Sequence, residues 1–448
     1  MTQRLESLTQ QLLEAARRAG ADAADAMAVS GSAIDIDVRQ GKLEQAERSE
    51  ATDLGLRVLV GQRQANVSAS DTSTNTIETL AARAVAMAKE APEDPYIGLA
   101  NPDQLATNWD AAALELWDDA PEPSPAELQE DARRAEAAAL AQSGVSQVQS
   151  AGASYGARQI WLAGTNGFSG GYTRTSRSTS CVAIAGEGLG MERDYDGDSR
   201  VFQSDLRTPE EIGSLAGQRA TERLKSRKPP TGAFPVIYDE RISSGLIGHL
   251  LAAANGSMIA RGSSWLMDAL GKQVLPSTIT LTEDPLRLRT QGSRPFDAEG
   301  LPTRARNIVE NGVLTGWTLD LATGRKLGMP STASAARSTG GGPSPTVTNL
   351  SMTPGNITRD QMIAEMGTGL LITSLIGASI NPTTGDYSRG ASGFWVENGE
   401  ITYPVNECTL AGNLRDMLMT VTPANDIRPW LSRVVPSLRV EGLTIAGA

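Results

Sequence analysis

The residue type with the widest catalytic range, histidine, occurs only once in this chain of 448 residues, as His249. Zinc sites built mainly from imidazoles need two or three histidines, and the H-E-x-x-H pattern needs two on one helical face with a glutamate between them. The residues that follow His249 are Leu-Leu-Ala-Ala, which supply neither a carboxylate nor a second imidazole. We therefore interpret His249 as a packed residue of an apolar helix, and we expect no metal ion or other cofactor in this chain.

Two further patterns resemble binding sites, and each lacks a required part. Asp194, Asp196 and Asp198 stand at alternate positions, as calcium ligands do, but Ser199 occupies the place where the calcium loop needs its glycine. We interpret the three aspartates as part of a polar strand or turn. The G-x-G-x-G run at 186–190 has no strand–turn–helix context, so nucleotide binding is not predicted.

The composition predicts an acidic cytoplasmic protein. The formal net charge is −12, and an acidic surface repels the phosphate backbone, so we expect no direct nucleic-acid partner. No apolar run approaches the ~18 residues that a membrane span needs, and the first residues lack the features of a signal peptide. Cys181 and Cys408 are isolated in the sequence, and we interpret them as buried small residues with reduced thiols.

Hydrophobic periodicity indicates that helices and strands follow one another in a repeated order over the first 225 residues. An amphipathic helix at 1–20 precedes strand-like runs, and a second helix begins at Asn75, with Glu78 completing a capping box. Helix-start patterns at Ser124 and Thr208 enclose another group of strands. The strand-like runs are 34–39, 43–48, 54–60, 64–70, 145–155, 158–163, 168–180, 182–187 and 192–202. Helix–strands–helix therefore occurs twice, without a repeat at the level of individual residues.

A charged, proline-rich segment at 225–235 predicts a boundary between two domains. We place an N-terminal α+β region at 1–225, with subdomains at 1–100 and 120–225, and a strand-rich C-terminal domain at 233–448. The predicted fold class is α+β, with mixed or antiparallel sheets and helices in the N-terminal part.

Short-range signals in the C-terminal domain indicate a helix at 241–255 and two hairpins. The hairpins are predicted by Asn311-Gly312 and Asn398-Gly399, because each pair lies between apolar alternations. Thr358 opens one more helix.

Several stretches of the sequence together carry a specific resemblance. In the C-terminal half they are DAEGLPTRARNIVENGVLTGWTLDLATGRKLG, MTPGNITRDQMIAEMGTGLLIT and GDYSRGASGFWVENGEITYPVNECTLAGN, and in the N-terminal half GLRVLVGQRQANVSASD and APEDPYIGL. In this order they resemble the TldD/PmbA family of metalloproteases, which also carries the label modulator of DNA gyrase. The resemblance covers nearly the whole chain.

The resemblance also implies which kind of subunit this is. The TldD kind carries H-E-x-x-x-H on the helix after the linker, with a later cysteine as third zinc ligand. The matching helix here, SSGLIGHLLAAANG, keeps only His249 as a degenerate motif position, and Cys408 lies before the place of the later ligand. The chain therefore resembles the PmbA kind, also called TldE. That kind is implied to be a non-catalytic subunit of a heteromeric zinc protease that acts on peptides and small unfolded proteins.

Three functions stay open from the sequence. The first is a pseudo-enzyme subunit that pairs with a TldD-like, zinc-bearing partner, or forms a homodimer when alone, with zinc expected only in the partner. The second is an interaction protein that binds peptides or a gyrase-related partner without protease activity. The third is an autonomous hydrolase that uses carboxylates such as Asp297 and Glu299, which stand in a D-x-E-G turn.

A glycine-dense segment at 385–393 supplies the candidate contacts. Its simplest interpretation is a tight turn at 388–393 that feeds the strand before Asn398-Gly399. The sharper hypothesis is that this segment lines a peptide channel or a partner interface, with its arginine contacting a carboxylate or a carbonyl. The residues proposed for this role are Asp386, Ser388, Arg389 and Gly390.

Overall fold

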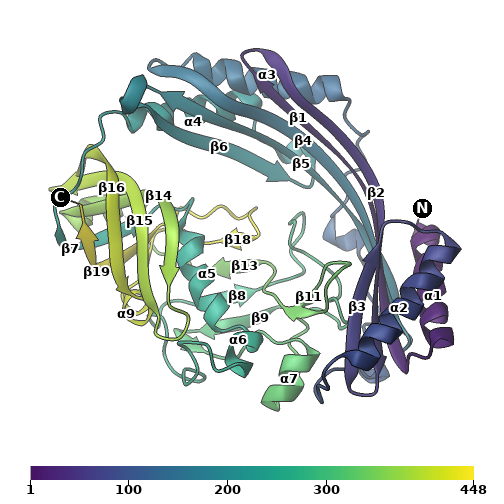
Figure 1. The fold of residues 1–448 in the computed structure, drawn as a ribbon. Helices are drawn as coiled ribbons and strands as arrows, with labels where there is room; N and C mark the ends of the chain where they lie inside the picture. The colour runs from purple at the N-terminus through teal and green to yellow at the C-terminus, as the bar shows by residue number, and fades with distance from the viewer. Residues whose placement is uncertain (1, 448) are drawn as a thin grey trace.

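The fold consists of an arched antiparallel sheet and a strand-rich domain beneath the arch (Figure 1). The computed structural model describes residues 2–447. Six strands form the arch in the order β3-β2-β1-β4-β5-β6, and each neighbouring pair is antiparallel. They are β1 (Ala23–Arg39), β2 (Lys42–Val60), β3 (Arg63–Ala69), β4 (Val145–Gly164), β5 (Ser169–Ala185) and β6 (Glu192–Arg200).

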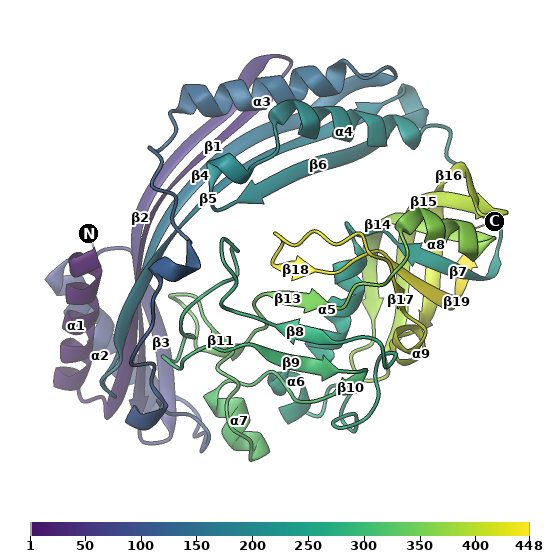
Figure 2. The same ribbon diagram turned by 180° about the vertical axis from the view of Figure 1, so that it is seen from behind.

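Four helices cover the convex side of the arch (Figures 1 and 2). At one end α1 (Thr2–Ala19) and α2 (Thr74–Glu90) pack their leucine and alanine faces against β1 to β3. At the other end α3 (Pro125–Leu140) and α4 (Pro209–Glu222) pack against β4 to β6. The order of one helix, three strands and a second helix therefore occurs twice, and the periodicity predicted this repeated helix–strands–helix order. Both copies share one continuous sheet because β1 pairs with β4.

The strands of the arch are longer than the sequence predicted. β2 is a single strand of 19 residues where two runs were expected, and β1 begins at Ala23 rather than at residue 34. β4 and β5 likewise each join two predicted runs. The missed part of β1 buries small side chains, Ala24, Ala26 and Ala28, under the covering helices. Alanine is depleted in strands, so its alternation gives a weak signal.

Helices begin by the predicted capping chemistry at three sites. Ser124, Thr208 and Thr358 are N-caps, and at each one the side chain three residues later accepts from the backbone N–H of the cap. The capping box expected at Asn75 is wrong, because Ser73 is the N-cap of α2 and accepts the N–H of Thr76. Four short 3-10 helices span Pro102–Gln104, Ala112–Leu114, Gly188–Gly190 and Gln203–Asp205.

The C-terminal domain is built around a ring of strands. Its main sheet has the order β16-β15-β14-β7-β19-β17, and a further pairing between β16 and β19 closes the ring. A smaller sheet has the order β10-β9-β8-β13-β18, and β11 pairs with β12. The strands are β7 (Gly232–Tyr238), β8 (Leu281–Glu283), β9 (Arg306–Glu310), β10 (Val313–Leu314), β11 (Ala335–Ala336), β12 (Ser344–Pro345), β13 (Leu350–Met352), β14 (Gly369–Ile380), β15 (Asp386–Glu397), β16 (Glu400–Asn413), β17 (Thr422–Pro423), β18 (Arg433–Val434) and β19 (Leu438–Ala446). The helices are α5 (Ser243–Ala253), α6 (Gly256–Ala260), α7 (Leu321–Leu327), α8 (Arg359–Met366) and α9 (Leu414–Met419).

Both predicted Asn-Gly hairpins are present. Asn311 and Asn398 have φ values of 49° and 54°, and the glycines that follow have φ values of 81° and 80°. Positive φ at both central residues is what a type I′ turn requires. The turns join β9 to β10 and β15 to β16.

The α+β class is confirmed, with an antiparallel N-terminal sheet and a strand-rich C-terminal part. Between α4 and β7 no helix or strand passes through Pro229-Pro230. Within residues 2–447, none of the helices combines the length and hydropathy that a membrane crossing requires.

Candidate functional site

His249 lies on α5, a helix that packs into the ring of strands. The apolar residues of this helix hold it there, since Leu246, Ile247 and Leu250 are at most 2% exposed. His249 itself is half-buried. Its ring meets the ring of Tyr387 edge-on, with centroids 5.8 Å apart and planes at 73°. The histidine is therefore held by aromatic packing against Tyr387 of β15.

Two tyrosines and an arginine complete a group that we call the His249 cluster, namely His249, Tyr238, Tyr387 and Arg389. Tyr238 ends β7, is fully buried, and lies with its hydroxyl 3.3 Å from the hydroxyl of Tyr387. Arg389 follows Tyr387 by two residues on β15, so both share one face of the strand. The charge of Arg389 acts on the imidazole and on both phenols.

Burial keeps the imidazole and the two phenols of the cluster neutral, beside the charged Arg389. Burial lowers the pKa of His249 below its usual range, and the neighbouring Arg389 lowers it further. The Nε2 atom of His249 is buried and has no hydrogen-bond partner. Burial also raises the pKa of both tyrosines, so the phenols stay protonated at physiological pH.

This donor set does not fit a zinc ion. Structural and catalytic zinc sites use imidazole, thiolate and carboxylate ligands, and the cluster offers one imidazole. The guanidinium of Arg389 adds a positive charge that repels a dication. No group of three or more His, Cys, Asp or Glu side chains able to hold a metal occurs within residues 2–447. The arrangement can instead donate hydrogen bonds to a neutral or anionic group.

Residues 386–393 belong to strand β15, so the predicted turn at 388–393 is wrong. β15 pairs with β14 on one side and with β16 on the other. Its glycines permit close contact with β14, because a Cβ on Gly390 would lie 2.5 Å from a methyl of Ile376 and one on Gly393 would lie 1.9 Å from the carbonyl oxygen of Leu371. Glycine density here marks tight strand packing.

The candidate contacts divide between the two faces of β15. Arg389 lies on the face of the His249 cluster, and its Nε donates to the carbonyl oxygen of Gly377 at 2.7 Å. Asp386 is exposed, and the hydroxyl of Thr384, followed by the amide of Asn413, lowers the pKa of its carboxyl. Ser388 and Gly390 alternate with Arg389 and therefore belong to the face of Asp386.

Sequence reasoning missed Tyr238 and Tyr387 as members of the cluster. Tyr387 stands inside the glycine-dense segment, and Tyr238 ends the strand before α5, so both were next to residues already chosen. No local pattern shows that they meet, because 149 residues separate them.

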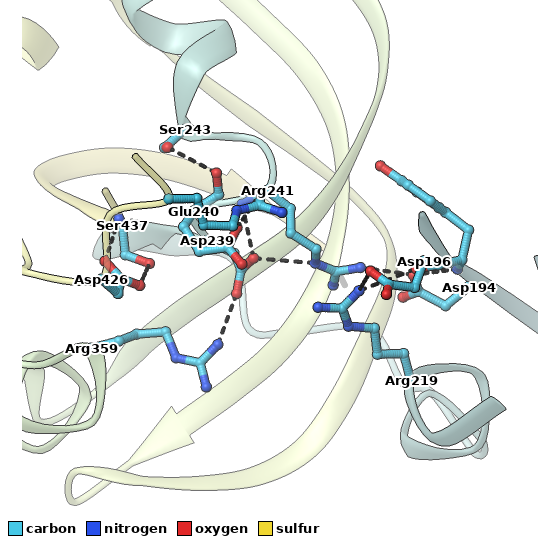
Figure 3. Close-up of polar contacts among 12 residues, drawn as sticks. Asp194, Asp196, Arg219, Asp239, Glu240, Arg241, Ser243, Arg359, Asp426 and Ser437 are labelled. Carbon is cyan, nitrogen blue, oxygen red and sulfur yellow. Dashed lines mark hydrogen bonds and ion pairs between the residues drawn. The ribbon is translucent and has the colours of Figure 1, made fainter. Parts of the chain in front are cut away.

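A buried ionic network holds the start of α5 against the arch (Figure 3). Arg241 forms ion pairs with Asp194 of β6 at 2.9 Å and with Asp239 at 3.2 Å. Arg359 contacts the second oxygen of Asp239 at 3.0 Å. Burial alone lowers the pKa of Arg241, but its two carboxylate partners outweigh burial and raise it. The network thereby positions α5, and His249 with it, relative to the sheet.

The remaining aspartates of β6 also have arginine partners. Asp196 pairs with Arg207 and Arg219, each at 2.8 Å, and Asp198 pairs with Arg200 at 3.0 Å. Their place on a strand agrees with the polar-strand interpretation, and their oxygens are occupied by ion pairs rather than arranged around a cation.

Asp297 and Glu299 organise a loop. Asp297 Oδ1 accepts the N–H groups of Glu299 and Leu301 at 2.9 and 3.0 Å, and Oδ2 accepts that of Ala335 at 3.1 Å. Glu299 Oε2 accepts the N–H of Leu321 at 2.8 Å. Burial first, and Asp297 second, raise the pKa of Glu299 well above its usual range. These contacts favour a structural role over hydrolysis.

Two G-x-S-x-G patterns do not form nucleophile elbows. The one at 152–156 lies within β4 and the one at 167–171 runs from a turn into β5, whereas an elbow needs a strand-to-helix turn. Ser154 Oγ lies 2.6 Å from Ser178 Oγ on the neighbouring strand. Neither serine therefore has the setting of a nucleophile.

Family models match three consecutive parts of the chain. They are described as PmbA/TldA metallopeptidase domain 1 at residues 24–88, central domain at 118–224 and C-terminal domain at 231–447. A relative named Metalloprotease PmbA, from Escherichia coli O157:H7, is 39% identical over 430 residues, which are 95% of this chain and 92% of the relative. The chain belongs to the PmbA/TldD metallopeptidase family. A Metalloprotease PmbA homolog from Haemophilus influenzae is 38% identical over 440 residues, which are 97% of this chain and 94% of the relative.

Solved structures share the PmbA/TldD fold. A protein from Bacteroides thetaiotaomicron, named as a candidate modulator of DNA gyrase, is 28% identical with a TM-score of 0.90. The match covers 99% of this chain and 98% of the Bacteroides chain. TldE from Thermococcus kodakarensis is 21% identical with a TM-score of 0.86, covering 98% of this chain and 100% of its own, and this likeness concerns the fold alone. All four residues of the His249 cluster lie in the part that matches the C-terminal domain of the PmbA/TldD family.

Proposed function

We propose that this chain is the zinc-free, non-catalytic subunit of a heteromeric metalloprotease that acts on peptides and small unfolded proteins. The observation that carries the proposal is the donor set of the His249 cluster. It offers one imidazole and no carboxylate. The sequence resemblance implies that α5 corresponds to the zinc-binding helix of the TldD kind of subunit. Membership of a metallopeptidase family and relatives named metalloproteases support the protease context.

In this proposal the chain contributes walls and contacts, and a TldD-like partner subunit contributes the zinc chemistry. The concave side of the arch faces the C-terminal domain, an arrangement suited to enclosing a substrate (Figure 2). Arg389 and the tyrosine hydroxyls offer donors for peptide carbonyl or carboxylate groups. The free, buried thiols of Cys181 and Cys408 support a reducing compartment such as the cytoplasm.

The decisive experiment measures zinc content and cleavage of an unfolded peptide for three samples. They are this chain alone, the H-E-x-x-x-H subunit from the same genome, and their mixture. We expect the chain alone to hold no stoichiometric zinc and to cleave nothing, and the mixture to cleave. About one zinc per chain, lost in His249→Ala, would overturn the proposal. A mixture that binds peptide without cleaving it would favour an interaction protein instead.

Arg389→Ala tests the proposed contact role within the mixture. The matched control is Arg133→Ala, because Arg133 lies on the convex side on α3 and is 51% exposed at its side chain. We expect unchanged folding in both variants, and weaker cleavage, seen chiefly as a raised KM, only in Arg389→Ala. Equal cleavage by both variants would remove Arg389 from the substrate path.

A further inference from the structure

A cavity of about 580 Å³ lies between the concave side of the arch and loops of the C-terminal domain. Four arginines line it, Arg158 of β4, Arg174 of β5, and Arg294 and Arg337 from the loops. Two carboxylates line it as well, Asp53 and Asp297. In a chain whose formal net charge is −12, this local excess of positive charge stands out as a place for an anion.

Several guanidinium nitrogens at this cavity are buried without a hydrogen-bond partner. Arg294 is 9% exposed, and its Nη1 donates to the carbonyl oxygen of Ala335 at 2.7 Å, while its Nε and Nη2 have no partner. The side chain of Arg337 is fully buried and pairs with Asp25 through Nη1, while its Nε and Nη2 are also unpartnered. A buried donor left unpaired costs about 1–3 kcal/mol, so an acceptor that reached these groups would be stabilised by them.

The nearby carboxylate does not satisfy these donors. Both oxygens of Asp297 accept backbone N–H groups. Its charge interacts with that of Arg294, but its oxygens do not accept from the unpartnered Nε or Nη2 of that arginine. Arg174 is held in place by hydrogen bonds to the carbonyl oxygens of Gln291 and Ser293, at 2.6 and 2.9 Å, and its guanidinium lies 5.1 Å from the ring centre of Tyr172. Its Nε is buried without a partner. The guanidinium groups are therefore fixed in position before any ligand arrives.

The wall of the cavity also carries apolar side chains, beside the uncharged polar Ser338, Thr339, Thr346 and Thr348. Its larger apolar side chains are Met27, Val29, Ile160, Leu162, Phe296 and Val347. A guanidinium matches the planar, two-oxygen geometry of a carboxylate, and an apolar wall beside it accommodates side chains rather than a bare inorganic anion. The volume lies within the range of about 300–1,000 Å³ typical of ligand sites.

We propose that this cavity binds a carboxylate group of a peptide, either its C-terminal carboxylate or an acidic side chain, with adjacent apolar residues on the wall. The inference rests on the proposed function, in that it assumes that this chain handles peptides. It assigns substrate selection to a subunit that performs no chemistry, and it places a carboxylate contact between the arch and the C-terminal loops, in addition to the contact proposed for Arg389.

The test measures binding to the full chain alone, without the zinc-bearing partner, by fluorescence anisotropy. Three labelled hexapeptides of the same apolar sequence are compared, with a free C-terminal carboxylate, with a C-terminal amide, and with an amide plus one internal glutamate. We expect the free acid to bind at least about tenfold more tightly than the plain amide, the factor for one charge-assisted hydrogen bond. The glutamate peptide distinguishes the two carboxylate sources. It binds as tightly as the free acid only if the cavity accepts a side-chain carboxylate in place of the C-terminal one.

Two cavity variants and one control complete the test. Arg294→Gln and Arg174→Gln should each weaken binding of the free acid about tenfold and leave the plain amide unchanged, whereas Arg133→Gln on the convex side should change neither. Thermal melting checks that each variant is folded. If Arg294→Gln, at the more buried position, unfolds the chain, the result for Arg174→Gln decides.

Equal binding of acid and plain amide peptides, or equal losses in Arg133→Gln and the cavity variants, would overturn the inference. Displacement of the acid peptide by an equal concentration of inorganic phosphate would reassign the cavity to phosphate and overturn it too. The binding assay does not depend on cleavage. A negative binding result therefore leaves the proposed subunit function untouched, and a mixture that fails to cleave leaves the proposed carboxylate site untouched.

Discussion

Replacing His249 by phenylalanine should stabilise the C-terminal domain. The substitution removes a buried Nε2 that has no hydrogen-bond partner and keeps an aromatic ring edge-on to Tyr387, now at 5.8 Å. An unsatisfied buried polar atom costs about 1–3 kcal/mol, and the slightly larger phenyl ring takes back part of that gain. We therefore expect His249→Phe to raise the free energy of unfolding by about 1 kcal/mol at pH 8.

The advantage of His249→Phe should grow as the pH falls. Burial, followed by Arg389, lowers the pKa of His249 in the folded chain, so the unfolded chain binds the proton more readily. The stability that His249 contributes is therefore complete above its unfolded pKa of about 6.5 and is lost as the pH falls through the folded pKa. A phenylalanine has no such loss, and each unit of pKa difference corresponds to about 1.4 kcal/mol.

Urea unfolding at pH 8.0 and pH 5.5, followed by tryptophan fluorescence, measures both effects. Trp265 and Trp395 report on this domain, since they are 3% and 1% exposed in its core. His249→Gln is the matched control, because it removes the titration but keeps a polar side chain, so it should lose the pH effect without the gain at pH 8.0. A phenylalanine variant that is less stable at both pH values, with the pH slope of the original chain, would refute the assignment of a neutral imidazole whose Nε2 has no partner.

Four other substitutions test buried charges and helix packing. Glu299→Gln should leave the stability of the fold unchanged near pH 4 and raise it increasingly toward alkaline pH. The pKa of Glu299 is raised in the folded chain, so the stability that this carboxyl contributes is complete below its unfolded pKa and is lost as the pH rises through its folded pKa. Melting temperatures measured against pH check this. Asp25→Asn should cost about 3–5 kcal/mol in urea unfolding, since it leaves two buried guanidinium groups without their carboxylate. Gly213→Ala should lower the free energy of unfolding by about 1–3 kcal/mol, because the new Cβ would lie 2.0 Å from the carbonyl oxygen of Ala135. A Cβ at Gly245 on α5 meets nothing within 4 Å, so Gly245→Ala should raise the free energy of unfolding by up to about 1 kcal/mol. Equal melting temperatures for the two alanine variants would contradict the packing of α4 on α3.

Local chemistry predicted the parts of the fold that depend on a few neighbouring residues. Asn398-Gly399 predicted a hairpin because that turn demands positive φ at both residues, and Ser124 predicted a helix start because its side chain caps the first turn. The length of β1 was not predictable in the same way, because its inner face is built from alanine under the covering helices. The turn expected at 388–393 failed because glycine serves close strand contact there.

The candidate site was only partly readable from the sequence for the same reason. His249 and Arg389 were chosen separately, one for its rarity and the other for its glycine-rich surroundings, and the structure brings them into one cluster. The arginine-lined cavity had no local signal at all. Arg174 and Arg294 come from different domains, and nothing near either residue in the sequence announces the other.

The continuous arch also sets the order in which this chain can fold. The N–H of Ala24 on β1 bonds to the hydroxyl of Thr165 just after β4, a partner 141 residues later in the chain. At a synthesis rate of about 5–20 residues per second, the hairpin of β1 and β2 leaves the ribosome on the order of ten seconds before β4 can cover its open edge. An uncovered edge is a template for pairing with other chains. Asp35 and Asp37 lie on that edge, and their charges are placed where they discourage such pairing until the second half arrives.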